Sequence, residues 1–267
     1  MEFEPPGPQG YGLDTICLFV RLVLSGVSLR GVPRVLEVVS AAWGLCVDVP
    51  HWTTGRLWLM RVGHAMLLDC RDLSKKFVPI DAKELRVVIV NSMVRHELSG
   101  GEYAERRRQC EEGVAYFQKG KPSIQALRDV AIHDVLAAKD KLSDVVFRRC
   151  RHVVGENDRA QKAAQLLADR QYEDVGELMV QSHKSLQHDY EVSCDELDFL
   201  SEEAMKVKGV YGARMTGGGF GGCIVALVQP RSVEALEAHI KQVYPAKFNV
   251  QPVIFSTTAT AGASVVE

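Results

Sequence analysis

A block of long helical patterns, with strand-like runs on both sides of it, constrains the fold of this chain most strongly. The run Ser99-Gly-Gly-Glu102 has the form of a capping box, and a charged amphipathic pattern then predicts a helix to about residue 118. A second capping box, Ser193-Cys-Asp-Glu196, opens the last helix of the block. Further helices are predicted at 123–141 with a break near His133, 144–170, 172–188 and 194–206.

The strand-like runs lie at 64–69 and 85–90 before this block, and at 209–215, 223–228 and 248–256 after it. The run at 85–90 reads Leu-Arg-Val-Val-Ile-Val, and such β-branched stretches are typical of a buried strand. One more helix is predicted at 232–244. Strands on both sides of a helical block predict an α+β fold, in which a mostly antiparallel sheet packs with several long helices.

The composition changes near residue 60. Before it, Gly, Pro and Trp are frequent and periodicity is poor, apart from a short helical pattern at 33–49 that Pro50 ends. We therefore predict an atypical N-terminal segment over 1–60, which is unfolded or forms only part of a domain. The folded domain is expected over 61–267.

Charge and targeting signals exclude several classes of protein. The net charge is only -2, so no global field draws the chain to nucleic acid or to an anionic membrane. The basic run Arg106-Arg-Arg108 has acidic neighbours at helical spacing, which predicts a solvated face with ion pairs. The apolar stretch at 13–29 is interrupted by Asp14 and Arg21, too often for a membrane span. We expect no nucleic-acid or membrane partner.

Cysteine and histidine spacing gives the expected compartment and metal content. The seven cysteines are scattered without a Cys-x-x-Cys pair, which suits free thiols in a reducing compartment. His183 and His188 have neither a ligand spacing nor a third partner, so no metal site is predicted. The N-terminus is acidic and rich in proline, unlike a signal peptide. We expect a cytoplasmic location.

A glycine loop at 216–222 is the strongest local motif, with five glycines in seven residues (Thr-Gly-Gly-Gly-Phe-Gly-Gly). Glycines allow positive φ and close ligand approach, so successive N–H groups could converge on a phosphate. The alternative is a tight, bulged connection between two strands. A dinucleotide fingerprint is excluded because the strand-like run at 223–228 follows where a helix is required. A P-loop is excluded because Cys223 stands where lysine would be needed.

The run Arg-Met-Thr-Gly-Gly-Gly-Phe-Gly-Gly-Cys at 214–223 resembles the third signature motif of galactokinases, in the GHMP kinase superfamily. Other segments resemble that family in the same order, at 63–71, 91–96, 101–111, 149–156, 182–186 and 189–194. The resemblance covers roughly residues 61–258. It implies a GHMP-kinase C-terminal-type domain, with the N-terminal kinase domain largely missing.

The resemblance also implies an activity and site residues. Galactokinases transfer the γ-phosphate of ATP to the anomeric hydroxyl of galactose, giving galactose 1-phosphate. Galactose and ATP are therefore expected as substrates, with Mg²⁺, by resemblance only. We expect no cofactor to be bound by the protein itself. Tyr103 matches a tyrosine that binds a sugar hydroxyl, although a core tyrosine remains the alternative. The expected support of the nucleotide site comes from Gly217, Gly218, Gly219, Phe220, Gly221 and Gly222.

Three family motifs that should precede residue 63 are not found: a G-R-x-N-x-I-G-E-H-x-D-Y-like segment, a G-G-G-L-S-S-S-A-like phosphate loop, and a G-I-M-D-Q-like segment with the catalytic aspartate. Asp69 matches a strand residue of the family and not the base. We therefore assign no catalytic residue and expect a truncated, inactive kinase. The alternatives are a non-catalytic galactose sensor or interaction module, and a relative of N-acetylgalactosamine kinase. An exposed domain interface would favour self-association.

Overall fold

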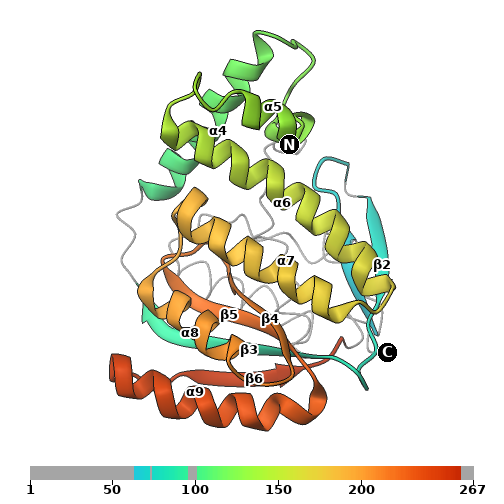
Figure 1. The fold of residues 1–267 in the computed structure, drawn as a ribbon, viewed down its shortest axis with the longest axis vertical. Helices are drawn as coiled ribbons and strands as arrows, with labels where there is room; N and C mark the ends of the chain where they lie inside the picture. The colour runs from blue at the N-terminus through green and yellow to red at the C-terminus, as the bar shows by residue number, and fades with distance from the viewer. Residues whose placement is uncertain (1–62, 73, 96–100, 260–267) are drawn as a thin grey trace, which may run out of the picture.

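The computed structural model describes residues 63–72, 74–95 and 101–259, and these form an α+β fold (Figure 1). The predicted N-terminal segment, 1–60, lies outside the described residues. The strands are β1 (His64–Leu68), β2 (Lys75–Pro79), β3 (Arg86–Arg95), β4 (Val210–Thr216), β5 (Gly221–Val228) and β6 (Val253–Thr257). The helices are α4 (Glu102–Gln118), α5 (Ile132–Ala137), α6 (Asp144–Ala168), α7 (Tyr172–Ser185), α8 (Asp195–Met205) and α9 (Val233–Phe248).

The main sheet has the strand order β4-β5-β3-β6, and its neighbouring strands are antiparallel. Successive side chains of a strand point to opposite faces. Val88 and Ala226 therefore face one side, where α8 and α9 bury them in the largest core. Val87 and Leu227 face the other side, toward α7 and the end of α6. A separate hairpin, β1-β2, lies beside this second layer.

A third apolar cluster joins α4, α5 and α6 above the sheet (Figure 1). Val146, Phe147 and Cys150 project from α6 into it and are buried. This cluster holds α4 against α6. The first turn of α4 is thereby fixed relative to the sheet, which matters for the site described below.

The outer edge of β4 is closed by helices. His183 of α7 accepts the backbone N–H of Met215 at Nδ1 (3.1 Å), and Ser201 of α8 donates to the carbonyl of Ala213 (3.1 Å). A Cβ added to Gly176 of α7 would lie 1.8 Å from the backbone oxygen of Tyr211, so only glycine permits this contact. Such caps protect an edge strand from pairing with another chain.

Two predicted elements are partly wrong. The stretch 123–141 holds only a 3₁₀ turn at Leu127–Asp129 and the short α5, because the Asp129 carboxylate accepts the N–H groups of Gln125 and Ala126 (3.0 Å each). The strand predicted at 248–256 begins only at Val253. Helix α9 runs on to Phe248 and ends at Asn249, whose left-handed φ of 54° terminates it.

Of the two predicted capping boxes, the one at 193–196 is wrong, and the one at 99–102 falls partly outside the described residues. The N-cap of α4 is Gly101, and Ser99 lies outside the described residues. The N-cap of α8 is Cys194, without a side-chain cap, because the hydroxyl of Ser193 donates to Asp198 Oδ1 (2.5 Å). Within the described ranges, no helix is long and apolar enough to cross a membrane.

Candidate functional site

The glycine loop is the connection between β4 and β5 of the main sheet. Positive φ occurs at four of its glycines and at Phe220, whose φ is 59°. Glycine adopts such angles without the Cβ clash that other residues suffer. The loop therefore forms the tight strand connection that the sequence left as one alternative, and its backbone turns sharply where the two strands meet.

One side of this loop rests on Val192. The N–H of Phe220 donates to the Val192 carbonyl at 2.7 Å. A Cβ added to Gly219 would lie 2.1 Å from the same oxygen. Because the Phe220 amide is already bonded within the protein, it is not a free donor for a phosphate group.

The other side of the loop is open. A Cβ added to Gly218 or Gly222 would meet no atom within 4 Å. A ligand could therefore approach the backbone closely at these two positions. The loop itself contains no acidic residue, so it offers no carboxylate to Mg²⁺. In the ranges that the structure describes, no group of three or more His, Cys, Asp or Glu could hold a metal ion.

Tyr103 lies in the first turn of α4 and is 65% exposed. A core tyrosine would bury its ring, so that alternative is wrong. The exposed phenol can both donate and accept a hydrogen bond, as the recognition of a sugar hydroxyl requires. One turn further along α4, Arg106 donates to the carbonyl oxygens of Tyr190 (2.7 Å) and Glu191 (2.8 Å).

Both the helix that carries Tyr103 and the glycine loop form hydrogen bonds to one short segment of the chain. Glu191 accepts from the helix that carries Tyr103, and Val192, the next residue, accepts from the glycine loop. The regions are more than 100 positions apart in sequence. The fold therefore places both around the same turn.

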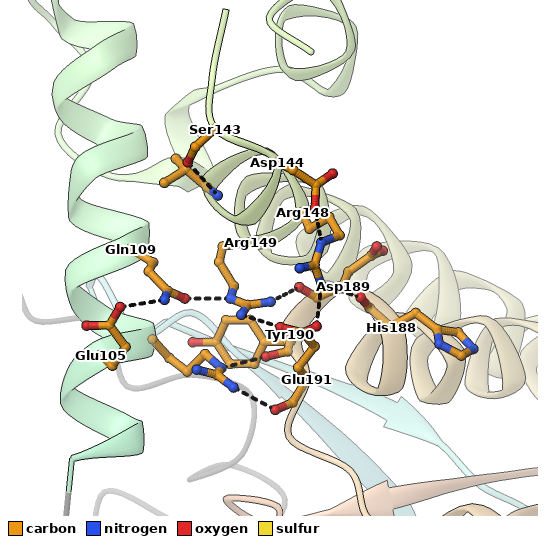
Figure 2. Close-up of polar contacts among 12 residues, drawn as sticks. Glu105, Gln109, Ser143, Asp144, Arg148, Arg149, His188, Asp189, Tyr190 and Glu191 are labelled. Carbon is orange, nitrogen blue, oxygen red and sulfur yellow. Dashed lines mark hydrogen bonds and ion pairs between the residues drawn. The ribbon is translucent and has the colours of Figure 1, made fainter. Parts of the chain in front are cut away.

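An arginine cluster at this turn, which we define as Arg106, Arg148 and Arg149, was not predicted from the sequence. Figure 2 shows Arg148 and Arg149 pointing toward the turn. Arg107 and Arg108 do form the predicted ion pairs along the helix surface, with Glu111 at 2.8 Å and Glu105 at 2.7 Å. Arg106 instead turns inward. The available signal was the position of Arg149, which lies at helical spacing from Val146 and Val153 on the apolar face of its helix.

A buried polar layer lies below the cluster, between α6 and α7. His152 Nδ1 is 3.0 Å from the Ser185 hydroxyl, and its ring stacks on Tyr190 at 4.5 Å between centroids. Burial lowers the pKa of His152 to about 4. The imidazole is therefore neutral in the folded protein at neutral pH, and it serves packing and hydrogen bonding in this layer.

The carboxylate of Asp69 takes part in an ion pair that supports the fold. Both of its carboxylate oxygens accept from the Arg128 guanidinium, which lowers the pKa of Asp69 to about 2. Arg71 pairs in the same way with Asp129 at 2.9 Å. These two pairs tie the end of β1 to the 3₁₀ turn, and the carboxylate of Asp69 is occupied there.

Residues 163–246 match the family of GHMP kinases C terminal. Human galactokinase is 50% identical over 182 residues, which cover 68% of this chain and 45% of that protein. The galactokinase of Chloroflexus aurantiacus is 46% identical over 210 residues, 78% of this chain and 53% of its own length. The solved structure of Lactococcus lactis galactokinase complexed with galactose superposes with a TM-score of 0.73 at 33% identity, over 78% of this chain and 54% of that one. The chain thus spans about half the length of the relatives that it matches.

Proposed function

Because this chain contains a GHMP-kinase C-terminal domain of the galactokinase type, we propose that it forms one side of a site in which ATP phosphorylates the anomeric hydroxyl of galactose. One observation carries the proposal. Tyr103 is exposed at the start of α4, and its helix is bonded to the same turn that seats the glycine loop.

Phosphoryl transfer depends mainly on positioned substrates and on stabilised charge. In this proposal the phenol of Tyr103 binds a hydroxyl of the sugar. The glycine loop supports the nucleotide region through the open backbone at Gly218 and Gly222. Mg²⁺ enters with ATP as part of the substrate, since the loop offers no carboxylate for it.

We further propose that the polypeptide of 267 residues has negligible kinase activity by itself. General-base and electrostatic catalysis need groups within hydrogen-bond reach of the reacting atoms. The sequence has no counterpart of the family's catalytic aspartate, arginine or phosphate loop. Tyr103 and the glycine loop do not supply those roles.

A titration followed by nuclear magnetic resonance tests the proposed site directly. Millimolar galactose is expected to shift amide signals in the first turn of α4, and ATP is expected to shift those of Gly218 and Gly222. Binding that is equally strong for N-acetylgalactosamine would point to a relative of that kinase. Galactose binding without ATP binding would point to a sensor. Unchanged spectra with both ligands would contradict the proposed site.

We also propose self-association through an exposed apolar surface on the strands β3 and β6. Met93, Val253 and Phe255 are 51%, 49% and 39% exposed there, although large apolar side chains are usually buried. The five described cysteines are free thiols, which supports a cytoplasmic location.

A further inference from the structure

The chain makes an unusual turn where α7 ends. A π-helical turn, Leu186–Tyr190, continues the helix, and Glu191 then adopts a left-handed φ of 55°. Left-handed backbone is uncommon for a residue other than glycine, and it persists only where the surroundings fix it. π-helical turns are also frequent at functional sites. The contacts that hold this turn therefore bear on what the turn does.

Arginine side chains bond four consecutive carbonyl groups of the turn, from His188 to Glu191. Arg148 donates to the first at 2.9 Å, Arg149 to the second, and Arg106 to the third and fourth at 2.7 and 2.8 Å. The last carbonyls of a helix lack partners within it and carry partial negative charge. The arginine cluster donates hydrogen bonds to these carbonyl groups and also places positive charge beside them.

Arg149 is the central member of the cluster, and only 2% of its side chain is exposed. Its Nε donates to Gln109 of α4 (2.6 Å), and its Nη2 donates to the Glu191 carboxylate (2.6 Å). Figure 2 shows the guanidinium lying between these partners and the carbonyl of Asp189. All three nitrogens are thus used, one on α4 and two on the turn. A lysine has one nitrogen and cannot reproduce this planar fork.

The turn leads directly into the residue that the glycine loop contacts. Val192 follows Glu191, and its carbonyl accepts from Phe220 at 2.7 Å. That oxygen also occupies the space that a Cβ on Gly219 would need. A change in the backbone at Glu191 would move this oxygen. The loop would then lose the hydrogen bond from Phe220 and the close packing at Gly219.

We propose that Arg149 is a positioning residue for the glycine loop. It fixes the left-handed turn at Glu191, and that turn aims the Val192 carbonyl at the loop. Through Gln109 and the neighbouring Arg106, the same cluster ties the loop to the helix that carries Tyr103. The inference deepens the proposed function and rests on it for the loop's role beside a nucleotide.

Amide hydrogen exchange of the full chain tests the positioning without any ligand. In Arg149→Lys and Arg149→Met, we expect the Phe220 amide to exchange at least tenfold faster, while amides of the β3-β5 ladder keep their rates. Glu191→Gln is expected to act in the same direction, and it remains available if an Arg149 variant fails to fold. Arg170→Met is the control, because Arg170 forms ion pairs with Glu84 (3.0 Å) and Asp81 (3.6 Å). It precedes the first residue of α7, whereas the turn follows the last residue of that helix.

Two results would overturn the inference. One is an unchanged Phe220 rate in the variants. The other is a rise that the ladder amides share in the same proportion, which would mean that Arg149 serves only general stability. If galactose and ATP shift no amide signals of the wild-type chain, the proposed function is contradicted. The exchange experiment uses no ligand and would keep its meaning, so the two failures are distinguishable.

Discussion

The N–H of Phe220 donates to the carbonyl oxygen of Val192 at 2.7 Å, and this bond joins the glycine loop to the turn that follows α7. It explains why a loop so rich in glycine is a poor phosphate cradle on this side. The remaining open side, at Gly218 and Gly222, is the part that can face a ligand.

Substitution of two neighbouring glycines is expected to change the stability by very different amounts. Gly219→Ala places a Cβ 2.1 Å from the Val192 oxygen at a φ of +90°, so we expect a loss of roughly 2–5 kcal/mol from strain and overpacking. Gly218→Ala meets open space and serves as the control, with a change within about 0.5 kcal/mol. Urea unfolding measures both. Equal effects of the two substitutions would contradict the described seat of the loop.

Tyr103→Phe tests the sugar contact. Removal of the hydroxyl should abolish the galactose-induced amide shifts in the first turn of α4 and leave the unfolding midpoint unchanged, because the ring is exposed. Tyr116→Phe, on the same helix and packed edge-to-face on Phe117 at 5.1 Å, is the matched control and should retain the shifts. Retained galactose shifts in Tyr103→Phe would exclude its hydroxyl as a sugar ligand.

The α+β fold was predictable because its helices are long and amphipathic, and because β5 is a continuous apolar run. Strand β2 was missed, since Lys75-Lys-Phe-Val-Pro79 is short, partly charged and only partly buried. The strand predicted at 85–90 extends in fact to Arg95, through the polar residues Asn91 and Ser92. The local sequence pattern cannot locate a short strand, or the end of a strand, when pairing with distant strands determines it.

The site was predictable only in its glycines and in Tyr103, which the family resemblance supplied. Arg149 was not singled out because its partners Gln109 and Asp189 are each 40 positions away. Arg106 was interpreted as part of a solvated face because its acidic neighbours lie at helical spacing. Its true partners are carbonyl groups, which no side-chain pattern reveals.

The stability of the protein should fall as the pH drops from 6.5 toward 4. His152 has a pKa of about 4 in the folded state against an ordinary 6.5, so the unfolded chain binds a proton in this window and the folded chain does not. The full shift corresponds to about 3 kcal/mol. In His152→Gln, the slope of unfolding free energy between pH 4.5 and 6.5 should flatten. An unchanged slope would show that other groups cause it.

Self-association should depend on the apolar side chains of β6. Phe255→Glu is expected to shift sedimentation velocity profiles toward the monomer, because a buried unpaired charge opposes association. Leu136→Glu is the control, since Leu136 is 54% exposed on α5, a helix that lies away from the main sheet in Figure 1. A wild-type chain that is already a stable monomer would contradict the proposal.

We propose that this chain supplies one side of a galactokinase site and that its sequence does not contain the groups that perform the chemistry. The most direct measurement is galactose-dependent ADP release by the purified 267-residue polypeptide with ATP and Mg²⁺. We expect no release above the sugar-free background. Turnover near that of a full-length galactokinase would contradict the claim.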